Sequence, residues 1–227
     1  MSRGPAIVTG AATGTGLALA RRLAADGFEV VLADVDEEAG RTVVEGIEGG
    51  RFVRCDVTVR GDVERLLMDA AGLRVLVNNA GGWAPGPQYP TAPFETWSRA
   101  LDLNLRGPML ATQLAIGAMR VAGGGVVINV ASSAGNESTP YASPEYGAAK
   151  AGLIRFTTAL GDLDGVRVNC IVPNWIRTER AEAELAAMSP EERAAAPGTI
   201  PLAVVCDAVM DLIDDESARG RVVVIDP

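Results

Sequence analysis

The sequence predicts an α/β protein with a doubly wound, mostly parallel sheet of about seven strands, arranged in three α/β/α layers. Short apolar runs rich in β-branched residues alternate with longer segments of helical periodicity. Because the runs are apolar on nearly every residue, we expect burial on both faces, and the helical crossovers imply parallel pairing. The predicted strands are residues 5–9, 28–33, 51–55, 73–77, 126–131, 166–171 and 221–225.

Two segments interrupt this alternation. Residues 81–93 are rich in Gly and Pro, and residues 177–201 are rich in Ala and Glu and contain Pro190, Pro197 and Pro201. Both are expected to be loops or lids. The chain has 227 residues, with no repeat and no linker-like change of composition. We therefore expect one domain over residues 1–227, with a substrate lid at about 177–201.

Composition argues against several classes of function. The net charge is −9 and no segment concentrates Lys or Arg, which disfavours nucleic acid as a partner. The apolar runs are far shorter than the roughly 20 residues of a membrane span, and the first residues do not resemble a signal peptide. Three widely spaced cysteines in apolar surroundings favour a reducing cytoplasm over disulfides or a metal site, and we expect no metal. The absence of histidine excludes a histidine base.

A glycine run, Thr9-Gly10-Ala11-Ala12-Thr13-Gly14-Thr15-Gly16, follows the first predicted strand and begins an apolar helix. In that context Gly10 permits a tight turn, Gly14 lets the backbone approach a diphosphate, and Gly16 permits close packing of the helix. The helix N-terminus adds N–H donors and a positive dipole. The pattern predicts a Rossmann fold that binds a dinucleotide, and the alternative is a plain glycine turn.

Asp34 ends the second predicted strand, where a carboxylate would accept hydrogen bonds from the adenosine ribose. A 2′-phosphate there would be repelled, and Thr13 stands where a basic residue could have neutralised it. The sequence therefore favours NAD over NADP. The alternative is that Asp34 only caps the next helix.

The glycine run, Asn78-Asn79-Ala80-Gly81 and Tyr146-Gly147-Ala148-Ala149-Lys150 together resemble the short-chain dehydrogenase/reductase family, in this order and over almost the whole chain. The resemblance implies that Asp56 and Val57 meet the adenine and that Ile176 and Thr178 fix the nicotinamide carboxamide. The cofactor residues it implies are Gly10, Thr13, Gly14, Thr15, Gly16, Asp34, Asp56, Val57, Asn79, Ala80, Gly81, Tyr146, Lys150, Pro173, Ile176 and Thr178.

The resemblance is not complete at every position. Thr15 replaces the usual isoleucine of the glycine run, and Asn174 replaces a typical glycine. Two alternatives stay open, since Asn78 and Asn79 could simply end a strand and Thr178 could simply cap a helix.

Tyr146 and Lys150 are four residues apart in a predicted helix that runs to about Leu160, so they share one face. A nearby ammonium favours the phenolate of a tyrosine, whose ordinary pKa is about 10, and the phenol can then exchange a proton with a substrate hydroxyl. The resemblance also implies that Lys150 bonds the nicotinamide ribose. The alternative is an ordinary surface pair of a helix.

Two further catalytic residues are implied. Ser132 and Ser133 both follow the fifth predicted strand, and either hydroxyl could polarise the substrate oxygen. Spacing back from Tyr146 favours Ser133, whereas strand register favours Ser132, which we choose. The resemblance assigns to Asn104 a helix kink and a water that links Lys150 to solvent, and the alternative is an asparagine satisfied within its helix.

The predicted function is hydride transfer between NAD(H) and the CH–OH or C=O group of a small alcohol or ketone. The alternatives are a dinucleotide-binding protein without activity and NAD-dependent chemistry without net redox. We expect the substrate pocket to be bordered by residues 82–89, 136–145 and those after Thr178. Trp83, Tyr141 and Trp175 would be its apolar walls. Arg177 and Arg180 could reach in, and a neutral substrate is favoured.

Assembly is predicted only in outline. The family commonly forms dimers or tetramers through the helices after Asp102 and around Tyr146, so we expect a homodimer or homotetramer. Small residues of the helix around Tyr146 would permit close approach of two subunits, although such residues also suit packing of this helix onto the sheet.

Overall fold

The computed structural model describes residues 2–137, 142–160, 163 and 165–227 and contains a parallel sheet of seven strands. The strands are β1 (Pro5–Thr9), β2 (Glu29–Asp34), β3 (Arg51–Arg54), β4 (Val75–Asn78), β5 (Gly125–Val130), β6 (Val166–Pro173) and β7 (Val222–Ile225), in the order β3-β2-β1-β4-β5-β6-β7. Every strand lies within two residues of its predicted bounds. The predicted doubly wound parallel sheet is therefore confirmed.

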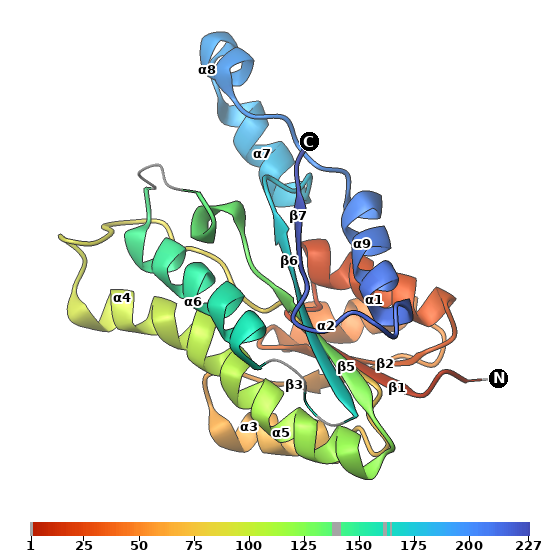
Figure 1. Ribbon diagram of the computed structural model, residues 1–227. Coiled ribbons are helices and arrows are strands. Elements are labelled where there is room, and N and C mark those ends of the chain that lie inside the picture. Colours follow the sequence, from red (N-terminus) through yellow and green to blue (C-terminus); the bar gives the residue numbers. More distant parts are fainter. Residues whose placement is uncertain (1, 138–141, 161–162, 164) are drawn as a thin grey trace.

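Helices cover both faces of the sheet (Figure 1). They are α1 (Gly14–Ala25), α2 (Glu37–Val44), α3 (Arg60–Met68), α4 (Phe94–Leu101), α5 (Gly107–Val121), α6 (Pro144–Leu160), α7 (Glu179–Ala187), α8 (Pro190–Ala195) and α9 (Leu202–Asp214). A π-helical turn (Asp102–Arg106) joins α4 to α5, and a 3-10 turn (Ser133–Gly135) follows β5. None of the helices in the described ranges is long and apolar enough to cross a bilayer.

Two separate cores result from the alternation of side chains along the strands. Ala6 and Val8 of β1 belong to a core that includes buried residues of α1 and α9, whereas Ile7 belongs to a core with α3 and α5. Successive residues of a strand point to opposite faces, so a strand that is apolar throughout feeds both cores.

The sheet places its crevice between β1 and β4. These strands are neighbours although β2 and β3 lie between them in the sequence, so the connections leave them in opposite directions. A parallel sheet binds ligands outside the carboxyl ends of its strands at such a switch point. The glycine loop after β1 and Asn79 after β4 both lie there.

The segment 177–201 is mostly helical, which corrects the prediction of a loop, whereas its role as a substrate lid stays a prediction. It forms α7 and α8, which project from the body of the molecule (Figure 1). Its Ala and Glu residues favour helix, and Pro190 begins α8 at a position that tolerates proline. Ser189 and Glu192 form a capping box there. Residues 81–93, by contrast, precede α4 without helix or strand, as predicted.

Candidate active site

A cavity of about 860 Å³ lies at the carboxyl ends of β1, β2, β3 and β4. It is lined by twelve of the predicted cofactor residues: Gly10, Thr13, Gly14, Thr15, Gly16, Asp34, Asp56, Val57, Asn79, Ala80, Gly81 and Thr178. Residues from five separate segments of the chain therefore meet in one place, which the spacing of the motifs alone did not require.

The glycine loop is shaped for close approach of a ligand. Gly10 has a φ of +64°, which other residues rarely adopt, and a Cβ on Gly16 would lie 2.0 Å from the Gly10 carbonyl oxygen. Asn79 Nδ2 donates to the carbonyl oxygens of Thr9 (2.9 Å) and Gly10 (3.0 Å) and so ties the loop to β4. Thr13 is the N-cap of α1 but makes no side-chain cap hydrogen bond. The first N–H groups of α1 are left for an anion.

Two carboxylates that follow β2 and β3 also line the cavity, Asp34 and Asp56. Asp34 Oδ2 accepts from the Ala12 N–H (2.9 Å), and Oδ1 accepts from the Asp36 N–H (3.1 Å). The cap of α2 is Asp36, so the alternative of Asp34 as a helix cap is wrong. Burial tends to raise the pKa of Asp56, but hydrogen bonds from the Thr58 hydroxyl and N–H hold that pKa below its ordinary value.

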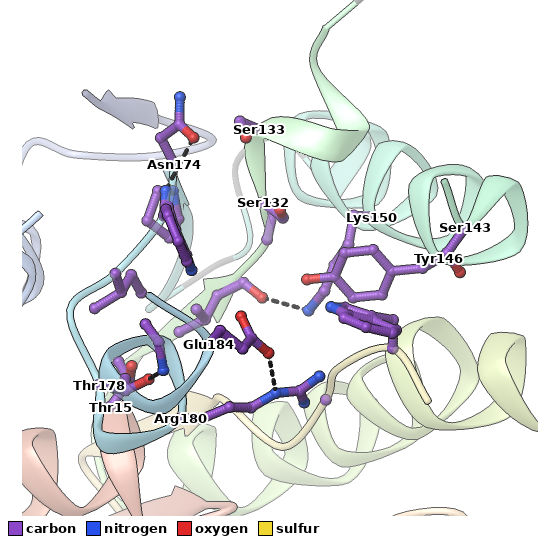
Figure 2. A pocket seen from close by; sticks show the side chains of 18 of the residues that line it. Thr15, Ser132, Ser133, Ser143, Tyr146, Lys150, Asn174, Thr178, Arg180 and Glu184 are labelled. Carbon is purple, nitrogen blue, oxygen red and sulfur yellow. Dashed lines mark hydrogen bonds and ion pairs between the residues drawn. The ribbon is translucent and has the colours of Figure 1, made fainter. Parts of the chain in front are cut away.

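A second cavity, of about 690 Å³, adjoins the first (Figure 2). Its lining includes the predicted Ser132, Ser133, Tyr146, Lys150, Pro173, Ile176, Trp83 and Trp175. The two cavities have Thr15, Asn79, Gly81, Thr178 and Arg180 in common. Tyr141 lies outside the described residues. The predicted borders of the substrate pocket are otherwise as expected, since residues of 82–89, 136–145 and α7 all line it.

Tyr146 and Lys150 lie on one face of α6, as their spacing predicts, and both point into this cavity (Figure 2). Lys150 Nζ is 5.6 Å from the centroid of the Tyr146 ring and donates to the Val130 carbonyl oxygen (2.8 Å). Lys150 is 3 % exposed and Tyr146 is partly exposed. The alternative of an ordinary surface pair is therefore wrong, because Lys150 is buried.

Lys150 is a deeply buried cation. Burial lowers its pKa from 10.5 to about 8. Cys170 is its acidic neighbour, but burial raises the pKa of that thiol to about 12, so the thiol is neutral near pH 7. Among the residues described, no carboxylate forms an ion pair with Lys150. Lys150 is also the only lysine of the chain.

Ser132 and Ser133 take different positions. Ser132 is extended and its hydroxyl accepts from the Ala134 N–H (3.2 Å), whereas Ser133 begins the 3-10 turn. In Figure 2, Ser132 lies on the side of Tyr146 and Ser133 lies further along the turn. Both line the cavity, so the choice of Ser132 stays a prediction that this arrangement supports.

Asn104 occupies the π-helical turn and is fully buried. Its Oδ1 accepts from the Gly82 N–H (2.8 Å), and its Nδ2 donates to the carbonyl oxygens of Gly82 (2.9 Å) and Ala100 (3.0 Å). The π-helical turn interrupts the α-helix at this point, and the bond to Ala100, four residues earlier, is the one that the alternative of an asparagine satisfied within its helix predicts. The side chain clamps the turn after β4, and a Cβ on Gly81 would meet both Asn104 Oδ1 (2.7 Å) and Lys150 Nζ (3.1 Å).

The segment after β6 contains Asn174, which departs from the typical glycine of the family, and Thr178. Asn174 has a negative φ, so the family's glycine is not required by the backbone here, and its Oδ1 accepts from the Trp175 N–H (2.9 Å). Thr178 is the N-cap of α7, and its hydroxyl accepts from the Ala181 N–H (3.3 Å). Thr178 thus caps a helix and lines both cavities, so the two interpretations of this residue are compatible.

Several lining residues were not singled out from the sequence. Glu184 of α7 and Gln88 of the loop after β4 both line the second cavity. Arg180 lines both cavities, whereas Arg177 lines neither and pairs with Glu182 instead. A period of four residues from Arg180 to Glu184 was the signal that could have indicated this pair.

Comparison with known proteins identifies the family. The model of the short chain dehydrogenase family matches residues 5–189. L-fucose dehydrogenase of Oryctolagus cuniculus is 38% identical over 83% of this chain and 68% of its own, and cyclopentanol dehydrogenase of Comamonas sp. is 34% identical over 97% and 94%. A crystal structure of actinorhodin polyketide ketoreductase with NADPH is similar at a TM-score of 0.88 and 28% identity, covering 99% of this chain and 97% of that one. The chain belongs to the short-chain dehydrogenase family of nicotinamide-dependent oxidoreductases.

Proposed function

We propose that this protein transfers a hydride between NAD(H) and the CH–OH or C=O group of a small alcohol or ketone. The observation that carries the proposal is that Tyr146, Lys150 and Ser132 line a cavity continuous with the one beneath the glycine loop. The proposal includes one domain over residues 1–227, with α7 and α8 as its substrate lid.

The cofactor, when bound, accepts or delivers the hydride. In alcohol oxidation the Lys150 ammonium stabilises Tyr146 as a phenolate, and this phenolate oxygen accepts the O–H proton of the substrate and becomes a neutral phenol. Ser132 donates a hydrogen bond to the substrate oxygen. Asn104 keeps the turn at Gly82 in place beside Lys150. Reduction of a ketone reverses each step, with Tyr146 as the proton donor.

The proposal is tested by mixing the protein with NAD and a panel of secondary alcohols and following NADH absorbance. We expect turnover with at least one neutral secondary alcohol. Stoichiometric NAD binding without any turnover over a broad panel of alcohols and ketones would contradict the proposal.

A neutral substrate is supported by the walls of the cavity. Trp83 and Trp175 provide apolar surface, and the one cation among its described exposed lining residues, Arg180, is paired with Glu184. An L-fucose dehydrogenase and a cyclopentanol dehydrogenase among the relatives also support an alcohol. A panel in which only carboxylate or phosphate substrates turned over would contradict this choice.

Ser132 and Ser133 can be separated by mutation. Ser132→Ala should lower kcat about 10²-fold, because a hydrogen-bond donor to the developing charge is lost. Ser133→Ala, the matched control, should retain most of the activity. Steady-state kinetics on both variants decides the assignment, and the reverse order would transfer the role to Ser133.

Asp34 should determine the choice between NAD and NADP. A carboxylate about 4 Å from a 2′-phosphate would repel it by about 1 to 4 kcal/mol, so wild-type kcat/KM should favour NAD by about five- to a thousandfold. Asp34→Asn should reduce this ratio, because it removes the charge that repels the 2′-phosphate. Any weakening of the hydrogen bond to the loop affects both cofactors alike and does not change the ratio. Asp36→Asn removes the same charge two residues away and preserves a capping side chain, so it should leave the ratio nearly unchanged. A wild-type preference for NADP would contradict the assignment.

Self-association through α5 and α6 is also proposed, as a homodimer or homotetramer. A groove of about 730 Å³ beside these helices is lined by apolar residues such as Leu110, Ile116 and Phe156. Light scattering that gave a monomer mass would contradict it. The three cysteines are free and buried, which supports a reducing, cytoplasmic location, and cell fractionation checks it.

A further inference from the structure

Arg180 stands where the two cavities meet. It lies in the first turn of α7, two residues after the cap Thr178, and lines both cavities. Figure 2 shows its side chain extending from the neighbourhood of Thr15 and Thr178 toward the side of the cavity that holds Tyr146 and Lys150. The proton transfer proposed for Tyr146 and Lys150 does not use Arg180.

Arg180 differs in the sign of its charge from the other ionisable residues of the first cavity, which we call the dinucleotide cavity. The carboxylates there are Asp34, Asp56 and Glu179. Among the described lining residues Arg180 is the single cation. A dinucleotide carries two negative charges on its diphosphate. The cavity therefore has one side chain that can offset the charge of the ligand.

The side chain of Arg180 is held through its Nε and its ring contact, and its two terminal amino groups take no part in these contacts. Its Nε donates to Glu184 Oε1 (2.9 Å), and the guanidinium carbon lies 4.8 Å from the centroid of the Trp83 ring. Within the described parts of the chain, the two terminal amino groups donate to no protein acceptor. Both contacts are with residues that line only the second cavity, so the terminal amino groups reach the glycine loop only if the guanidinium turns toward it.

The start of α7 lies directly against the glycine loop. A Cβ built on Gly14 would be 3.5 Å from Thr178 Cγ2, which is ordinary contact. Gly14 begins α1, whose first N–H groups and positive dipole attract an anion. Arg180 therefore extends from the segment that covers this anion-binding end of the cavity.

We propose that the terminal amino groups of Arg180 bind the diphosphate of the dinucleotide. The inference rests on the proposed function, because it assumes a dinucleotide in this cavity. A diphosphate is favoured over an acidic substrate as the partner, since Glu184 lines the substrate cavity beside Arg180 and would repel a substrate carboxylate. It lines only that cavity and not the dinucleotide cavity.

The test measures binding and not turnover. ADP-ribose carries the diphosphate without nicotinamide, and adenosine carries neither phosphate. Arg180→Gln should weaken ADP-ribose binding about tenfold, the loss of one charged hydrogen-bond partner, and should leave adenosine binding unchanged. Arg180→Lys keeps the charge and should lose less. Arg177→Gln is the matched control, because Arg177 lies three residues earlier and lines neither cavity. Titration calorimetry gives the first affinity, and saturation-transfer NMR the second.

Salt dependence provides a second readout. If Arg180 neutralises the diphosphate, the affinity of the wild type for ADP-ribose should fall more steeply with salt than that of Arg180→Gln. Thermal unfolding should be nearly the same for both, since Arg180 is exposed.

The outcomes separate this inference from the proposed function. Equal ADP-ribose affinity in wild type and Arg180→Gln would overturn the inference and leave the proposed function intact. An equal loss of adenosine and ADP-ribose binding would show a structural effect and would overturn it as well. An unchanged ADP-ribose affinity with a raised KM for the alcohol would transfer Arg180 to the substrate. Failure of the wild type to bind ADP-ribose would overturn both.

Discussion

Tyr146→Phe should lower kcat by about 10²- to 10⁴-fold, the usual contribution of a positioned acid or base. Phenylalanine keeps the ring beside Lys150 and removes only the oxygen that exchanges the proton. The chain has no histidine that could replace it. Cofactor affinity, measured by titration calorimetry with NAD, should change little, because the glycine loop and Asp34 are untouched.

The matched control is Tyr89→Phe. Tyr89 is 56% exposed and does not line the substrate cavity, and its contact with Glu145 is made by the backbone N–H, which the variant keeps. It should retain full activity. Full NAD-dependent turnover in Tyr146→Phe would show that another group carries the proton.

Lys150→Met should also slow turnover by about 10²- to 10⁴-fold, since the phenolate loses its cation. Its effect on stability should have an unusual dependence on pH. The pKa of Lys150 is depressed in the folded state, from 10.5 to about 8, so between these values the unfolded chain binds more protons. Stability of the wild type therefore rises with pH across this window, and below pH 8 the full cost of the buried charge remains.

The variant has no such group, so its stability relative to wild type should be greatest near pH 7. That advantage should shrink by about 3 kcal/mol as the pH rises to 10.5, which corresponds to the shift in pKa. The lost hydrogen bond to the Val130 carbonyl oxygen is independent of pH and cancels in this comparison. Urea unfolding at several pH values gives the free energies.

Arg155→Met is the matched control, because Arg155 is an exposed cation on the same helix and remains charged over this range. It should show no such change with pH. A direct measurement is available as well, since lysine labelled with ¹⁵N gives a single side-chain signal in this chain, which should titrate near pH 8. A signal that titrated above pH 10 would contradict the burial argument.

The strands and the motifs could be predicted from the sequence because both depend on local pattern. Buried parallel strands are apolar throughout, and the glycine loop follows β1 within a few residues. The segment 177–201 was harder, since its prolines indicated loops although Pro190 begins α8. Proline has either meaning according to its position in the helix.

Contacts between distant segments could not be predicted in the same way. The clamp of Asn104 on Gly82 spans 22 residues, and the bond from Lys150 to the Val130 carbonyl oxygen spans 20. Nothing in either residue type specifies its partner, because the partner is a backbone group placed by the fold. Arg180 and Arg177 are likewise equivalent in the sequence, and only the direction of α7 separates them.

The burial of Lys150 has a practical consequence for work on this protein. Every other basic side chain is an arginine, so reagents that acylate amines find no lysine on the surface. Dye esters and amine-coupled sensor surfaces would then react at the N-terminal amine or, slowly, inside the active site. Coupling at the N-terminus would present all molecules in one orientation, and protection of Lys150 by a bound dinucleotide would report on occupancy of the cavity.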